Sequence, residues 1–196
     1  MIGAMDKPAD DLFTEHETPT MRNLIQYSPA LMNPHMVAAS YADAALRLAR
    51  SYTGQPWDDV MLLPSMFLWR QAIELEIKRT IKRLTELRVE NGETSSELMP
   101  KAVSRRLQFK IGHDLRGLLA ELEEDIDALT LQPLPAPVTK TLLLLAELDN
   151  GGTSFRYPYL LQTEGRNLDF ASLTESLSDA FDLLSVVIDA ATNGEG

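Results

Sequence analysis

Residues 64–90 constrain the fold of this chain more than any other segment. They read PSMFLWRQAIELEIKRTIKRLTELRVE, with no glycine and with no proline after the first residue. Apolar side chains recur at three- and four-residue intervals, the period of a helix with a buried face. At 1.5 Å per residue such a helix is about 40 Å long. We therefore predict a long central helix that ends at Asn91-Gly92, a pair typical of helix C-termini.

The buried surface of this helix is predicted to change along its length. Its apolar stripe consists of Trp69, Ile73, Ile77, Ile81, Leu84 and Leu87. In the first half the stripe is widened by Phe67, Leu68, Ala72 and Leu75. We expect neighbouring helices to cover the first half on several sides and the second half on one side, as in a bundle.

Other segments show the same helical pattern, and none shows the alternation of a strand. Helices are expected at 36–52, 115–129, 139–149 and 169–191, with a short one around 97–106. Asn33-Pro34 supplies a cap and a first-turn proline for the first of them. The predicted fold is all-α: an up-and-down bundle of four to five helices in residues 33–192, with an extended or loosely ordered arm at 1–32 and a tail at 193–196.

Composition excludes several kinds of site. The chain has no cysteine and only three histidines, so neither a thiolate site nor an imidazole zinc site is expected. The Glu-x-x-His pairs of a helical di-iron site are missing, because Lys110 stands three residues before His113. No apolar run approaches the ~20 residues that span a bilayer, and the N-terminus is acidic where a signal peptide is basic. We predict a soluble cytoplasmic protein with no metal and no cofactor.

The charge is unevenly distributed. The formal net charge is −11, which argues against broad adhesion to nucleic acid. Residues 70–116, however, hold 11 of the 18 Lys and Arg residues and only seven Asp and Glu residues, a local balance of +4. This basic strip can be a solvated helix face, a steering surface for an anionic ligand, or a contact for the acidic region of a second copy.

The first motif is Arg70, Glu74 and Lys78, spaced four residues apart with alternating charge on the long helix. One interpretation is a pair of intrahelical ion pairs, each contributing a few tenths of a kcal/mol. The other depends on their position in the most apolar half of the helix. Partly buried there, Arg70 and Glu74 need partners from other helices and can organise a polar site.

The second motif is His113-Asp114, at the start of the helix predicted from Leu115. Either side chain can cap that helix. Alternatively, the imidazole lies at the edge of a groove and exchanges a proton near neutral pH. Arg106 lies seven residues earlier in the chain.

The third motif is the loop Phe155-Arg156-Tyr157-Pro158. Its arginine can stack between the aromatic rings and tie down the end of the preceding helix. Equally, the planar guanidinium can be presented to a phosphate or a carboxylate.

Taken in order, the three motifs resemble the HEPN superfamily of prokaryotic helical domains, over about residues 36–190. The matching residues are Phe67, Trp69, Arg70, Gln71, Ala72, Glu74 and Lys78, then His113, Asp114, Leu115 and Leu118, then Arg156, Tyr157 and Pro158. The resemblance implies a dimeric four- or five-helix bundle. Many such domains are metal-independent ribonucleases of toxin, antiphage and stress systems, with an Arg, four to six residues, then His late in the bundle.

At that late position Arg156 is present, but no histidine follows it in the chain. Superfamily members without this histidine are taken to be binding or scaffold modules, some of them linked to nucleotides. The resemblance therefore implies a non-catalytic or degenerate homodimeric module of a defence or stress system, joined through its longest helices. Its polar groove is expected to contain Arg70, Glu74, Lys78, His113, Asp114, Arg156 and Tyr157.

Two alternatives remain at this stage. One is a metal-independent endoribonuclease in which His113 acts with Arg156 or with Arg106, on RNA as substrate. The other is an acidic adaptor whose arm, residues 1–32, docks on a partner protein, such as one encoded in the same operon. RNA or a nucleotide is a possible ligand of the binding module and of the ribonuclease. No membrane contact is expected.

Overall fold

The computed structural model describes residues 33–156 and 168–193. The predicted arm at 1–32, Tyr157-Pro158 and residues 194–196 lie outside this described part of the chain. All secondary structure within the described part is helical, so the all-α prediction is confirmed. Its six α-helices are α1 (Pro34–Arg50), α2 (Leu62–Glu90), α3 (Pro100–Arg105), α4 (Leu115–Ala128), α5 (Ala136–Asp149) and α6 (Phe170–Asn193).

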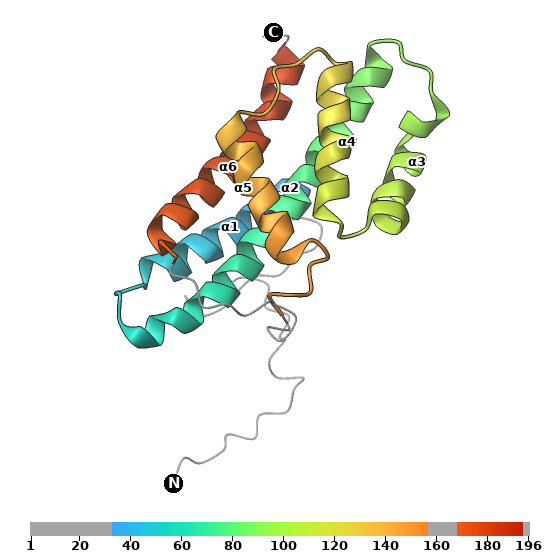
Figure 1. Cartoon of the computed structure of the whole chain (residues 1–196). Coiled ribbons are helices and arrows are strands. Elements are labelled where there is room, and N and C mark those ends of the chain that lie inside the picture. Colours follow the sequence, from blue (N-terminus) through green and yellow to red (C-terminus); the bar gives the residue numbers. More distant parts are fainter. Residues whose placement is uncertain (1–32, 157–167, 194–196) are drawn as a thin grey trace, which may run out of the picture. The chain divides into compact units, whose positions relative to one another are not determined.

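The long helix α2 is the centre of the fold. Helices α1, α4 and α6 all pack against it, and α5 packs against α6 and α4 (Figure 1). All six residues of the predicted apolar stripe are buried, as is Ala72. Phe67, Leu68 and Leu75 are half-buried and pack against the same core. The wide apolar surface of the first half is thus covered on several sides, as its composition predicts.

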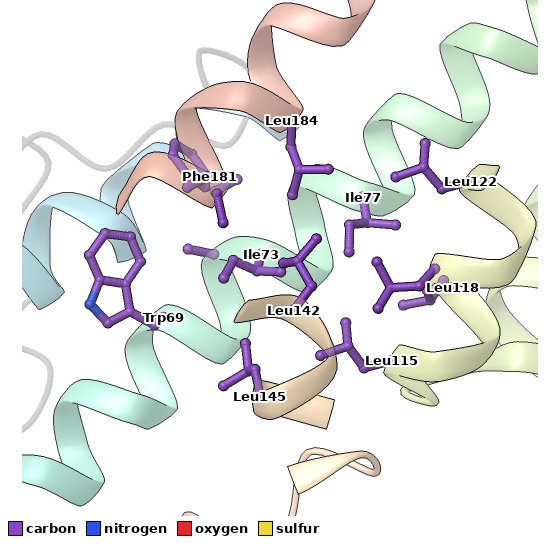
Figure 2. Close-up of a cluster of buried hydrophobic side chains, with 14 of the residues drawn as sticks. Trp69, Ile73, Ile77, Leu115, Leu118, Leu122, Leu142, Leu145, Phe181 and Leu184 are labelled. Atoms are coloured by element: carbon purple, nitrogen blue, oxygen red, sulfur yellow. The ribbon is translucent and has the colours of Figure 1, made fainter. Parts of the chain in front are cut away.

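Side chains from four helices meet in the core (Figure 2). Ile73 and Ile77 of α2 lie among leucines of α4, α5 and α6. The labelled leucines of this cluster are Leu115, Leu118 and Leu122, Leu142 and Leu145, and Leu184. Burying each such side chain contributes about 1.5–3 kcal/mol, so this cluster is the main source of the stability of the fold.

The helix boundaries follow local signals, with one correction. The Asn33 side chain accepts a hydrogen bond from the Met36 backbone N–H at 2.8 Å, which confirms the predicted cap. Helix α5 begins at Ala136, three residues before the predicted start at residue 139, with Pro137 in its first turn. Proline is tolerated there because the first turn of a helix does not use its backbone N–H groups.

The segment between α2 and α4 is more divided than the single short helix expected at 97–106. A 3₁₀ turn, η4 (Ser96–Leu98), precedes α3, and a π-helical turn, η5 (Arg106–Ile111), continues it. A further 3₁₀ helix, η3 (Pro56–Met61), links α1 to α2. None of the helices in the described part combines the length and the hydropathy needed to cross a membrane.

Candidate functional site

Arg70 is fully buried and joins three segments of the chain. Its Nη1 donates to Glu74 Oε2 at 2.7 Å, one turn along α2. Its Nε donates to the carbonyl of Asp149 at 2.9 Å. Its Nη2 donates to the carbonyls of His113, at 2.5 Å, and Asn150, at 3.0 Å. One guanidinium therefore fixes α2 to the end of α5 and to the turn before α4.

Glu74 is the acidic centre of this cluster, and its side chain is almost fully buried. Besides Arg70, its carboxylate contacts Lys78 Nζ at 2.6 Å and His113 Nδ1 at 2.8 Å, both through Oε1. Burial by itself raises the pKa of Glu74. The hydrogen bond from Lys78 and the positive charge of Arg70 outweigh this, so the pKa lies below the ordinary value. Glu74 is therefore a buried carboxylate at neutral pH.

His113 lies over this carboxylate with 66% of its side chain exposed. Because ionised Glu74 can only accept, Nδ1 carries the hydrogen of their shared bond. Nε2 makes no hydrogen bond to the described residues. A buried carboxylate thus orients an exposed imidazole, which is the arrangement of a general acid or base.

Asp114 caps α4, as one interpretation of the sequence predicted. Its Oδ1 accepts from the Gly117 backbone N–H at 3.0 Å and from Asn150 Nδ2 at 2.9 Å. The bond from Gly117 is the main reason why the pKa of Asp114 is lowered. Asn150 Oδ1 in turn accepts from the Arg116 backbone N–H at 3.0 Å. Asn150, the residue after the predicted helix at 139–149, therefore connects α5 to the first turn of α4.

Arg156 ties down its own loop. Its Nε and Nη2 donate to the carbonyl of Gly152, at 3.0 and 2.6 Å, and its guanidinium lies 5.9 Å from the centre of the Phe67 ring. Gly152, at φ +74°, lies against the cluster: a Cβ there would stand 3.8 Å from both Arg70 Nη2 and His113 Cβ. The loop after α5 thus covers Arg70.

Asp149 shapes that loop, and the sequence offered no sign of it. Its Oδ1 accepts from the backbone N–H groups of Thr153, at 2.8 Å, and Ser154, at 2.9 Å. The same residue supplies the carbonyl that accepts from Arg70 Nε. Its buried carboxylate therefore folds the loop over α2.

The predicted groove is assembled only in part. Lys78 and His113 lie at the surface, but Arg70 and Glu74, which we expected to line a groove, lie beneath it because the two loops that supply their partners cover them. Tyr157 lies outside the described residues. Arg106 donates to Glu121 Oε1 at 2.6 Å and to the Glu97 carbonyl at 2.9 Å, and its contacts within the described part do not include His113.

Another buried carboxylate, Glu76, was missed by sequence reasoning. It pairs with Arg79 on its own helix, with His35 Nδ1 of α1 at 3.2 Å, and with Ser185 Oγ of α6 at 3.0 Å. Burial opposes its ionisation, but the hydrogen bonds from Arg79 and His35 lower its pKa. Glu76 therefore ties α1 and α6 to α2, and it leaves His35 partly exposed.

Asp125 of α4 also carries a buried carboxyl group. Its Oδ1 accepts from Arg88 Nη1 at 2.7 Å, while Oδ2 is buried with no hydrogen-bond partner in the described part of the chain. Burial raises the pKa of Asp125 to about 6, although Arg88 acts in the opposite direction. At neutral pH Asp125 is thus an ionised, buried carboxylate with a hydrogen bond to only one of its two oxygens within the described residues.

Asp125 is expected to make stability fall as the pH rises from 5 to 7.5. Its folded pKa, about 6, lies above its ordinary value of 3.8, so the folded state binds the proton more tightly and protonation stabilises it. Urea unfolding of the wild type and of Asp125→Asn at several pH values measures this. The wild type should gain stability relative to the variant as the pH falls across 6. A difference that does not change with pH would contradict the assignment.

A surface hollow lies away from these residues. It has a volume of about 410 Å³ and lies between the end of α1 and the start of α6, with Tyr52, Phe170 and Thr174 in its wall. None of the cluster residues around His113 contributes to it. The convergent polar groups lie instead in the His113 cluster.

The fold and the site define an all-helical protein in which a buried Arg-Glu pair supports an exposed histidine. No group of three His, Asp or Glu side chains within residues 33–156 and 168–193 is placed to hold a metal ion. No family model, no curated protein and no solved structure matches the chain.

Proposed function

We propose that this protein is a HEPN-like up-and-down bundle that acts as a non-catalytic homodimeric binding or scaffold module of a prokaryotic defence or stress system. The observation that carries the proposal is that the hydrogen bonds of the motif residues hold the helices together. Arg70, Glu74 and Asp114 form hydrogen bonds that join α2, α4 and the end of α5. Motif residues used in this way stabilise the packing of the helices. This role does not require the histidine that is missing after Arg156.

The surface of the cluster supports binding of an anionic group, such as the phosphate of a nucleotide or of RNA. The His113 ring and the Lys78 ammonium group both reach the surface beside the buried Glu74. Arg156 lies on the adjoining loop, but it already donates to the Gly152 carbonyl. The accessible positive charge thus comes from Lys78, beside the exposed His113 ring.

A metal-independent ribonuclease is the second candidate, and one observation favours it. Glu74 holds Nδ1 of an exposed imidazole, so Nε2 is available to take a proton from a ribose hydroxyl. A ribonuclease of this kind needs a cation to stabilise the negative charge of the transition state. The guanidinium of Arg156 instead donates to the Gly152 carbonyl of its own loop.

RNA cleavage in excess EDTA separates the two candidates. We compare the wild type with His113→Ala, Arg156→Ala and His35→Ala, the last as a matched control because His35 is also an exposed histidine paired with a buried glutamate. The expected result is no cutting by a protein that sedimentation shows to be a folded dimer at micromolar concentration. Cutting that His113→Ala and Arg156→Ala abolish, and His35→Ala does not, would establish the ribonuclease. A strictly monomeric protein would contradict the proposed module.

A further inference from the structure

The outer side of α3 and η5 carries a row of exposed basic residues around an exposed aromatic ring. We call Lys101, Arg105, Phe109 and Lys110 the basic stripe; all four are exposed, and Phe109 is 74% exposed. The helix α3 lies at the edge of the helices in Figure 1 and leads through η5 to α4. The stripe is separate from the His113 cluster and takes no part in its hydrogen bonds.

Helical geometry places the stripe on one side of the segment. Lys101, Arg105 and Phe109 are spaced four residues apart, about 6 Å along the axis per step. The opposite side is anchored to the bundle, since Val103 and Leu107 are buried in the core. The stripe therefore faces away from the protein interior.

The cations of the stripe lack the ion pairs that several other arginines of the described residues make. Within the described residues, Lys101, Arg105 and Lys110 make no ion pair. By contrast, the arginines that pair with acidic side chains include Arg47, Arg70, Arg79, Arg83, Arg88 and Arg106. In a chain of net charge −11, a local group of cations without internal partners is available to an external anion.

The backbone supplies a second, independent observation. Phe109 lies in the π-helical turn η5, which ends at Gly112 with φ +61°. Turns of this type are rare and occur frequently at functional sites. In this turn Phe109 is exposed, between Arg105 and Lys110 in the chain. Its ring therefore contributes little buried apolar surface to the stability of the fold.

We propose that the basic stripe binds single-stranded nucleic acid. A base stacks on the exposed Phe109 ring while neighbouring phosphates contact the three cations, which is how strands are held without sequence preference. A protein partner fits less well, because a stable interface needs roughly 800 Å² per partner with an apolar centre, and Phe109 is flanked by polar residues. This inference does not depend on the proposed function.

Fluorescence anisotropy with labelled ten-nucleotide oligouridine and oligothymidine in 50 mM salt tests the inference. Phe109→Ala should weaken binding about 5- to 160-fold, because stacking contributes roughly 1–3 kcal/mol per base. Phe109→Tyr keeps a ring and should bind as the wild type does. Three phosphate contacts give a salt slope of about −2, so 200 mM salt should weaken wild-type binding about 15- to 20-fold.

Matched controls isolate the stripe. Trp57→Ala removes another exposed aromatic ring, 68% exposed on η3, and Arg47→Gln removes another exposed arginine; neither should change the affinity. No binding by the folded wild type, equal binding by Phe109→Ala, or equally tight binding of a polyglutamate peptide would overturn the proposal.

Discussion

Replacing Arg70 with methionine is expected to lower the free energy of unfolding by about 3–5 kcal/mol, the usual cost of removing one partner of a buried ion pair. Arg70 is fully buried and donates to one carboxylate and three backbone carbonyls. Methionine fills part of the space but donates nothing. It leaves buried Glu74 without the hydrogen bond and the positive charge of Arg70, and it releases both loops from α2.

Urea unfolding at pH 7, followed by far-ultraviolet circular dichroism, measures this loss. Arg47→Met is the matched control: Arg47 also pairs with an acid four residues away, Asp43, but at the surface, and its loss should cost under about 0.5 kcal/mol. If Arg70→Met does not fold, Arg70→Lys keeps the charge and some of the bonds and should give an intermediate loss. Equal small losses at Arg70 and Arg47 would contradict the role assigned to the buried pair.

The cost of Arg70→Met is also expected to shrink in acid. The pKa of Glu74 is lowered in the folded protein, so its ionised form contributes stability above its ordinary value of 4.5, and that contribution is lost as the pH falls further. Without Arg70 part of this contribution is missing, although Lys78 and His113 still contact Glu74. The difference in stability between wild type and variant should therefore shrink at low pH, and the part that comes from the three carbonyls should remain.

Truncating Ile77 to alanine is expected to cost about 2–5 kcal/mol, through lost burial and the cavity left behind. Ile77 is fully buried where α2 meets α4 and α6, beside Leu118 and Leu184 (Figure 2). Ile77→Val removes one methyl group and should cost about 0.5–1.5 kcal/mol.

The control for Ile77 is Val186→Ala, at an exposed position of α6, which should change stability by no more than about 0.5 kcal/mol. Urea unfolding compares the three variants under one condition. A loss at Ile77 no larger than that at Val186 would show that α2 is not the centre of the core.

The helices of this protein could be predicted because each is encoded by a local pattern. The spacing of apolar residues in 64–90 predicts the helix and its buried side, and the structure differs at its start by two residues. The cap at Asn33 and the cap at Asp114 were predictable for the same reason, since each acts within three residues of its own position.

The sequence predicts which residues belong to the candidate site, but it does not predict their contacts with residues far away in the chain. The spacing of Arg70, Glu74 and Lys78 predicts contacts along one helix, and both ion pairs are present. Nothing local to Asn150 or Asp149 shows that their carbonyls accept from Arg70, which lies about 80 residues earlier in the chain. Glu76 looks like any surface acid of a charged helix, yet it is buried against Ser185.

The sequence by itself determined the all-helical class, the position of the central helix and the residues of its buried stripe. These depend on hydrogen bonds and side-chain contacts that span three or four residues. The tertiary structure alone decided that Arg70 and Glu74 lie under two loops, that His113 is oriented by a carboxylate of α2, and that Arg106 pairs with Glu121. The physical reason is that these contacts join segments that meet only when the helices pack.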